Sequence, residues 1–505
     1  MSVTFFLRSV VVAVVAVTLT ACSAPVVPEP SKAPEVVPAE YAPFYEQALE
    51  WTDCHDGMQC ATATAPLDWA EPAGDTISLA LVRHPSSGSK KLGSLFVNPG
   101  GPGASGVNFI ADSLDYAVSA DVQKNYDVIG FDPRGVGAST AVVCVDTPAQ
   151  LDDYLFAPYL ATRNTPEWYA ERQVSSEAFA AGCAQRTGDL LAHVDTVSAA
   201  HDLDMLRAVV GDRELNYLGY SYGTLLGAIY AENFPGNVGR MVLDGALDPA
   251  SSSFEVNLTQ SVGFENALRA YLADCLAGSD CPFSGSVDSA MTQVGELLAS
   301  LETAPLTASD GRVLGADAML TAIIAPLYDK AAWSFLSEVF TGVSEGDADQ
   351  AFGAVDWYYN RNDDGTYADN STEAFIAINC LDYPVSSDPA QWEADAKKLV
   401  EKAPIIGPYM SYGDQLCSAW PYKAVLKPGK VSAKGAGDIL VVGTTGDPAT
   451  PYKWAQALAK ELEGGHLITY NGEGHTAYNK SNSCVNNAVD GFLLSGKVPA
   501  TDPKC

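Results

Sequence analysis

Basic residues are scarce in this sequence, and closely spaced cysteine pairs of the C-x-x-C type are missing from it. The 505 residues include 29 Lys and Arg against 62 Asp and Glu, a formal charge of −33. Nucleic-acid binding needs clustered positive charge to neutralise phosphates, so we expect no nucleic-acid partner. Without a C-x-x-C pair the zinc and redox motifs of that type are absent, and we expect no metal and no cofactor. The charge balance predicts either an acidic surface kept soluble by self-repulsion or one that attracts cationic groups such as peptide amino termini, and the charge count alone does not choose between them.

The chain also lacks an apolar run long enough to cross a bilayer, which takes about 20 residues. After Arg8 the apolar run SVVVAVVAVTLTA has only 13 residues. Its last three residues together with Cys22 form the sequence LTAC (Leu19–Cys22). A charged start, a short apolar run and a small-residue end are typical of a secretory signal peptide, here residues 1–21. LTAC is similar to a bacterial lipobox, which predicts cleavage before Cys22 and a lipid-modified amino terminus; the alternative is an ordinary signal with an incidental cysteine. We therefore expect an exported lipoprotein facing the cell envelope, on a Pro- and Ala-rich tether over residues 22–45.

The remaining ten cysteines are even in number, as expected of an exported chain stabilised by disulfides. Spacing alone cannot prove a pairing, but neighbours along the chain suggest one. The suggested pairs are Cys54–Cys60, Cys144–Cys183, Cys275–Cys281, Cys380–Cys417 and Cys484–Cys505.

Short apolar runs that end in Gly or Pro alternate with helical stretches, which predicts an α/β fold with a mostly parallel sheet. The run TISLALVRH (76–84) alternates like an exposed edge strand, whereas the others are continuous, as in buried parallel strands. The continuous runs are GSLFVNPGG, YDVIGFDPRG, LNYLGYS, GRMVLDGALDP, GDILVVGTTGDPATP and HLITYNGEGH.

Between two of these strands the pattern becomes helical, which predicts a large cap inserted before the last core strands. Three amphipathic stretches lie there, beginning SFEVNLTQSVG, SVDSAMTQVG and DPAQWEADAK. We expect a core over residues 46–249, the helical cap over 250–434, and the rest of the core over 435–505.

The pentapeptide G-Y-S-Y-G places Ser221 between Gly219 and Gly223, after a strand and before a helix. This is the pattern of a nucleophile elbow, in which the glycines allow strand and helix to approach closely and the serine projects from a strained turn. Small residues also gather at such turns for steric reasons alone. The flanking strand and helix favour Ser221 as the catalytic nucleophile.

A serine nucleophile needs a base and an acid that orients it. Of the six histidines, only His475 lies in a Gly-bounded loop after the last strand. Asp447 follows the preceding strand and is the favoured acid, with Asp244, after an earlier strand, as the rival. The order Ser221, Asp447, His475 is that of α/β-hydrolases.

The oxyanion of such a reaction needs backbone N–H donors. Tyr222, directly after the nucleophile, supplies one. The loop VNPGGPGASG (97–106) is placed to supply the other, from Gly101 or Gly100. A phosphate-binding loop is the alternative, but no G-K-[ST] follows the glycines.

Five ordered motifs together resemble the secreted tripeptidyl aminopeptidases of actinobacteria, which are relatives of proline iminopeptidases. The motifs are NPGGPGASG, YDVIGFDPRGVGAS, GYSYGTLLGAIYAENFPGNVGRMVLDGALDP, TTGDPATP and GEGHTAY, within residues 66–505. The resemblance implies an α/β-hydrolase fold, the triad Ser221, Asp447 and His475, and hydrolysis of peptides through an acyl-enzyme. Asn98 stands where proline iminopeptidases proper have histidine. AINCLDYP (377–384) also resembles a cysteine-and-aspartate motif of the family.

An aminopeptidase must recognise the free amino terminus of its peptide substrate. The physical requirement is a carboxylate near the nucleophile, and the candidates are Asp382 and Glu265; the competing interpretation for each is a structural carboxylate. Thr450, which with Pro451 has the pattern of a helix N-cap and first turn, is a further substrate-binding candidate.

Two other functions remain open from the sequence. A carboxylesterase acting on cell-envelope acyl chains would use the same triad, although six acidic cap residues lean towards peptides. A non-catalytic receptor on a hydrolase fold would have lost part of the triad. The six cap residues are Glu255, Glu265, Asp274, Asp280, Asp288 and Glu296.

Overall fold

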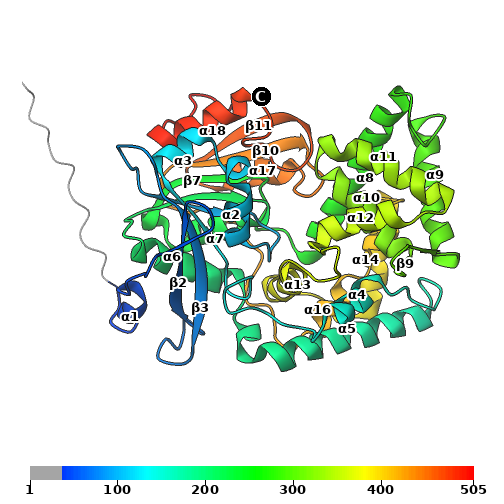
Figure 1. The fold of residues 1–505 in the computed structure, drawn as a ribbon, viewed down its shortest axis with the longest axis horizontal. Helices are drawn as coiled ribbons and strands as arrows, with labels where there is room; N and C mark the ends of the chain where they lie inside the picture. The colour runs from blue at the N-terminus through cyan, green and yellow to red at the C-terminus, as the bar shows by residue number, and fades with distance from the viewer. Residues whose placement is uncertain (1–36) are drawn as a thin grey trace, which may run out of the picture. The chain divides into compact units, whose positions relative to one another are not determined.

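The computed structural model describes residues 37–505, which contain a nine-stranded sheet in the order β1-β2-β3-β5-β4-β6-β7-β10-β11 (Figure 1). The strands β5, β4, β6, β7, β10 and β11 run parallel to one another. The pairs β1–β2, β2–β3 and β3–β5 are antiparallel. The signal peptide and Cys22 lie outside the described residues. The strands are β1 (Thr52–Cys54), β2 (Met58–Pro66), β3 (Thr76–His84), β4 (Ser94–Asn98), β5 (Asp127–Phe131), β6 (Leu215–Tyr220), β7 (Val238–Asp244), β10 (Ile439–Gly446) and β11 (Gly465–Glu473).

Helices cover both faces of the sheet, because its central strands are apolar on both sides. In β4, Phe96 packs into one core cluster, while Leu95 and Val97 pack into the cluster on the other face. The α/β class and the parallel core strands expected from the sequence are confirmed. One face carries α6 (Thr196–Val209), α7 (Tyr222–Asn233) and α17 (Lys453–Glu461), and the other carries α2 (Gly106–Ala117), α3 (Ala120–Asn125) and α18 (Ser483–Ser495).

The strand β3 is not at the edge of the sheet, contrary to the sequence expectation. It pairs with β2 on one side and β5 on the other. The segment MQCATATAP of β2 is rich in Ala and Thr, so its strand pattern is weak. The short hairpin of β1 and β2, closed by the Cys54–Cys60 disulfide, forms the edge instead.

The insertion between β7 and β10 is helical and has an apolar core of its own. This core also includes Phe156 of α4, and Arg163, in the loop between α4 and α5, pairs with Asp317 of α10 at 2.8 Å. The segment before β6 thus helps to build the cap, which the sequence did not indicate. The helices are α4 (Pro148–Phe156) and α5 (Pro166–Thr187), then α8 (Ser253–Ala277), α9 (Val287–Thr303), α10 (Ala316–Leu327), α11 (Trp333–Glu345), α12 (Asp349–Tyr359), α13 (Ser371–Asp382), α14 (Pro389–Lys402), α15 (Gly407–Met410) and α16 (Asp414–Ser418), with a two-stranded ribbon of β8 (Leu306–Thr307) and β9 (Val313–Leu314).

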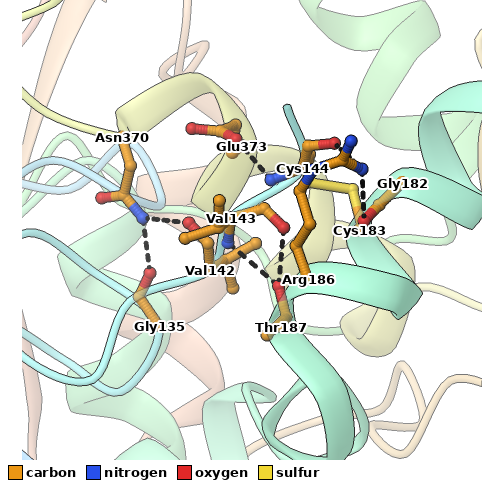
Figure 2. Close-up of a disulfide and its surroundings, with 10 residues drawn as sticks. All are labelled: Gly135, Val142, Val143, Cys144, Gly182, Cys183, Arg186, Thr187, Asn370 and Glu373. Carbon is orange, nitrogen blue, oxygen red and sulfur yellow. Dashed lines mark hydrogen bonds between the residues drawn. A yellow bond between two sulfur atoms is a disulfide. The ribbon is translucent and has the colours of Figure 1, made fainter. Parts of the chain in front are cut away.

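Helix α13 packs on the hydrolase core rather than in the cap, although it lies within the insertion. Figure 2 shows its attachment beside the Cys144–Cys183 disulfide: Asn370 donates to the carbonyls of Gly135 and Val142, both at 2.9 Å. The Glu373 carboxylate accepts the Cys144 N–H, and burial raises the pKa of Glu373. The 250–434 segment is therefore not a uniform cap.

Five disulfides occur in the structure, in the pairing that neighbourhood along the chain suggested. Cys380–Cys417 joins α13 to α16, so it links the core-bound helix to the next part of the insertion. No helix among the described residues is both long and apolar enough to span a membrane.

Candidate active site

Ser221 occupies the turn between β6 and α7. Its backbone angles are φ 55° and ψ −124°, a region that few residues other than glycine adopt. The glycines on either side are required by space: a Cβ on Gly219 would lie 2.3 Å from the Gly223 carbonyl oxygen, and one on Gly223 would lie 2.8 Å from Asn98 Oδ1. The Ser221 N–H donates to the Asp244 carbonyl at 2.9 Å. The turn thus has the strained geometry of a nucleophile elbow.

His475 and Asp447 form a hydrogen-bonded pair. His475 Nδ1 lies 2.9 Å from both carboxylate oxygens of Asp447, whose side chain is fully buried. The carboxylate also accepts the N–H groups of Ala449 (3.0 Å), Thr450 (2.8 Å) and Thr476 (3.2 Å). With Nδ1 facing this carboxylate, the other ring nitrogen, Nε2, is the one left to act on the nucleophile.

His475 Nε2 is buried and has no hydrogen-bond partner among residues 37–505. The backbone at Asp244 and Gly245 contacts both the histidine and the nucleophile. The Asp244 carbonyl accepts the Ser221 N–H, and a Cβ on Gly245 would lie 3.2 Å from His475 Cε1. The hydrogen bond from Ser221 Oγ to Nε2 is not formed in this structure. Such bonds are often long without substrate and tighten in the complex.

Of the two candidate donors in the loop over residues 97–106, here called the oxyanion loop, the structure leaves Gly101 and not Gly100. The Gly100 N–H donates to Asn98 Oδ1 at 3.0 Å, so Gly100 is not free to bind an oxyanion. Its role is steric, because a Cβ there would lie 2.5 Å from the Tyr220 carbonyl oxygen. The N–H groups of Gly101 and Tyr222 make no hydrogen bond within the described part of the chain. The structure leaves Gly101 and Tyr222 as the pair of donors.

Asp132, which follows β5, fixes the chain after the oxyanion loop. Its carboxylate accepts from Ser105 Oγ (2.6 Å), Val107 N (3.0 Å) and Ala138 N (2.8 Å). Burial raises the pKa of Asp132, and these three donors act in the opposite direction. The carboxylate therefore holds the start of α2 in place.

Asp244, the rival acid, does not contact the imidazole. Its carboxylate accepts from the N–H groups of Ala477 (3.0 Å) and Tyr478 (2.7 Å), directly after the catalytic histidine. Burial raises the pKa of Asp244, against these two donors. Asp244 holds the His475 loop, and the geometry assigns the acid role to Asp447.

Thr450 neither caps the following helix nor faces a substrate. It is 2% exposed, and its hydroxyl donates to Asp447 Oδ2 at 2.9 Å. Helix α17 begins only at Lys453, with Tyr452 at the cap position. Thr450 therefore serves as a hydrogen-bond donor to the buried Asp447 carboxylate, through both its N–H and its hydroxyl.

Asp382 is a structural carboxylate and not a substrate contact. It is 0% exposed and accepts from Thr196 N (2.8 Å) and Thr196 Oγ1 (2.5 Å). Burial raises the pKa of Asp382 to about 7, while the two Thr196 donors act to lower it. A buried group already satisfied in this way cannot receive a substrate ammonium.

Glu265 also points away from the catalytic residues. A Cβ on Gly263 of the same helix would lie 2.2 Å from the Pro448 carbonyl oxygen, so this face of α8 covers the Asp447 loop. Two positions further along, the helix has turned by about 200°. There Glu265 accepts from the N–H groups of Ile405 (3.1 Å) and Ile406 (3.0 Å) inside the cap.

Tyr328, at the end of α10, is a cap residue of the site that the sequence did not reveal. Its carbonyl accepts the His475 N–H at 2.7 Å, and the two rings meet edge to face with centroids 5.4 Å apart. Burial raises the pKa of the Tyr328 phenol. No local motif marks Tyr328, because the contact joins segments far apart in the chain.

One cluster of candidate metal ligands occurs among the described residues, formed by Cys54, His55 and Cys60. Its two sulfurs form a disulfide. A zinc site of this kind requires thiolates, so the cluster offers none.

The nucleophile after β6, the acid after β10 and the base after β11 define a serine hydrolase of the α/β-hydrolase fold. Residues 403–505 match the family model described as TAP-like protein. The chain is 35% identical to "Serine protease Hip1" of Mycobacterium tuberculosis, over 92% of each chain. It is 36% identical to "Carboxylesterase B" of the same organism, over 92% of this chain and 91% of the relative.

A third relative is the "Tripeptidyl aminopeptidase" of Streptomyces lividans, 33% identical over 90% of this chain and 86% of the relative. This chain therefore belongs to the tripeptidyl aminopeptidase-like family of α/β-hydrolases, and the family resemblance of its motifs is confirmed. It is an enzyme, a serine hydrolase.

Substituting the two aspartates separately distinguishes their roles. Asp447→Asn removes the charge that holds the imidazole tautomer, and we expect kcat to fall by roughly 10⁴-fold, as in other serine hydrolases with this change. Asp244→Asn keeps an acceptor for the loop N–H groups, and we expect a loss below about tenfold. The measurement is kcat on a model ester, with thermal unfolding of both variants as the control. A larger loss for Asp244→Asn would reverse the assignment.

Proposed function

We propose that the protein is an exported serine peptidase that releases short peptides, and most simply tripeptides, from free amino termini. Ser221 Oγ attacks the scissile carbonyl while His475 Nε2 takes its proton, and the oxyanion accepts from the Gly101 and Tyr222 N–H groups. His475 then protonates the leaving amine, and water hydrolyses the acyl-enzyme with His475 again as the base. Asp447 stabilises the imidazolium in both steps.

The observation that carries this proposal is that the insertion touches the site from two sides. On the histidine side, the Tyr328 carbonyl binds the His475 N–H at 2.7 Å. On the oxyanion side, a Cβ on Gly103 would lie 2.6 Å from the Ser371 carbonyl oxygen and 2.8 Å from Phe375 N. A site flanked in this way admits the end of a chain more readily than the middle of a folded polypeptide. This supports an exopeptidase.

The acidic residues of the cap give less support than their number suggests. Asp274 pairs with Lys330 at 3.3 Å and Asp288 with Arg269 at 2.7 Å, while Glu255 caps α8. These three carboxylates thus already have partners within the cap. The preference for a free amino terminus rests on the flanked site and on the net charge of −33, which attracts cationic chain ends.

A carboxylesterase is the second candidate, and one observation favours it. Trp357 and Tyr358 of α12 are 57% and 41% exposed, and the Tyr358 ring lies 6.2 Å from that of Tyr328 beside the catalytic histidine. Exposed aromatic surface next to an active site suits an acyl chain as well as an apolar side chain. The relative named "Carboxylesterase B" agrees with this alternative.

Peptide libraries with free and with acetylated amino termini separate the two candidates. We expect mass spectrometry to show tripeptides released from the free termini and nothing released from the acetylated set. The matched control is Ser221→Ala, which must release nothing from either set. Cleavage of neither library by an enzyme that still hydrolyses acyl esters would favour the carboxylesterase, and equal internal cleavage of both would indicate an endopeptidase.

We also propose that Cys22 is the lipid attachment site and that the enzyme is held at the cell membrane, facing outward. The support is the lipobox-like LTAC followed by a Pro- and Ala-rich sequence.

The attachment predicts that the full chain, expressed in an actinobacterial host, lies in the membrane fraction and takes up an alkyne-tagged fatty acid. Cys22→Ala should lose the label, because the acylated residue is gone. Ser23→Ala, at the next position, should keep it. Labelling of Cys22→Ala to the level of the unaltered chain would contradict this assignment.

A further inference from the structure

Three buried side chains, far apart in the sequence, join the insertion to the oxyanion hole. Asp382 ends α13, Thr196 opens α6, and Tyr222 opens α7. Thr196 Oγ1 lies 2.5 Å from an Asp382 carboxylate oxygen and 2.5 Å from the Tyr222 hydroxyl. Tyr222 is 5% exposed and the other two are 0% exposed, so water does not compete for these bonds.

The donors in this chain of bonds can be ordered. The Thr196 N–H and hydroxyl both donate to the Asp382 carboxylate. A threonine hydroxyl carries one hydrogen, so Thr196 Oγ1 accepts from the Tyr222 hydroxyl. The Tyr222 hydroxyl therefore donates to Thr196, and the Thr196 hydroxyl donates to Asp382. The negative charge of the carboxylate polarises both hydroxyls and strengthens both hydrogen bonds.

Tyr222 is the residue whose backbone N–H faces the oxyanion. The hydroxyl of its side chain is hydrogen-bonded to Thr196. This bond holds the Tyr222 ring in place and with it the first turn of α7. The second donor, Gly101, lies in the loop that meets the other end of α13, where a Cβ on Gly103 would be 2.6 Å from the Ser371 carbonyl oxygen. Helix α13 thus contacts Thr196, which bonds to Tyr222, at one end and the loop that contains Gly101 at the other.

We propose that α13 is a brace for the oxyanion hole, and that Asp382 and Thr196 are positioning residues acting through Tyr222. The brace rests on the proposed acyl transfer at Ser221. It gives the insertion a part in the chemical step, in addition to any part in substrate selection. Asn370 and Glu373 anchor the first turn of the brace to the core beside the Cys144–Cys183 disulfide, as Figure 2 shows.

The test removes the hydroxyl link and keeps the fold. Thr196→Val preserves the shape and the N–H donor to Asp382, while Thr196→Ser restores the hydroxyl. Tyr222→Phe cuts the other end of the link. Tyr230→Phe is the matched control, because this buried tyrosine of α7 bonds to Asp204 and not to the brace. Assays are run at pH 8, above the pKa of about 7 of Asp382.

We expect kcat on a model ester to fall about tenfold in Thr196→Val and Tyr222→Phe, with KM changed less than twofold, because misaligning a donor costs part of the 10²–10³-fold that its removal costs. Thr196→Ser should recover most of the rate. The melting temperatures of Thr196→Val and Tyr222→Phe should fall no further than that of Tyr230→Phe, which also loses a buried hydroxyl bond. Equal rates in Thr196→Val and Thr196→Ser, a loss confined to KM, or an equal loss in Tyr230→Phe would overturn the brace. An unaltered enzyme without ester hydrolysis would instead overturn the proposed function, and the brace with it.

Discussion

Close packing of backbone at the Ser221 elbow is the constraint on which the rest of the site depends. Space for a side chain is missing at Gly219, Gly223 and Gly100, where a Cβ would approach other atoms within 2.3, 2.8 and 2.5 Å. This contact sets the φ of 55° at Ser221 and brings the oxyanion loop against the first turn of α7. The strain of the turn is held by the sheet on both sides, through the Asp244 carbonyl and the neighbouring strands.

Carboxylates outside the triad hold the loops that the elbow brings together. Asp132 fixes the chain after the oxyanion loop, Asp244 fixes the chain after His475, and Asp382 reaches Tyr222 through Thr196. Each of these carboxylates is buried and accepts backbone N–H groups. Burying a carboxylate costs free energy unless these hydrogen bonds form, so each one favours a single conformation of the loop that it holds. The insertion contacts these loops through α13, which packs on the core, and through Tyr328 of the cap.

The sequence predicted what local patterns determine. Continuous apolar runs predicted the parallel strands, and the G-x-S-x-G motif with its neighbours predicted Ser221, Asp447 and His475, which the structure places after β6, β10 and β11. Prediction from the sequence failed where the role of a residue depends on a partner that no local motif identifies. The roles of Thr450 and Gly100 depend on the acceptors Asp447 and Asn98. Glu265 faces the inside of the cap because α8 turns Gly263 to the core, and no spacing rule in one sequence reports that orientation.

Catalysis at this site requires that the His475–Asp447 pair activates Ser221 as a nucleophile. The rate of covalent labelling by a fluorophosphonate measures this activation, with the modified peptide identified by mass spectrometry. We expect a single label on Ser221, formed rapidly in the unaltered protein and at least about a hundredfold more slowly in His475→Ala, since the general base contributes 10²–10⁴-fold. A label on another residue, or equal rates in the two proteins, would contradict it.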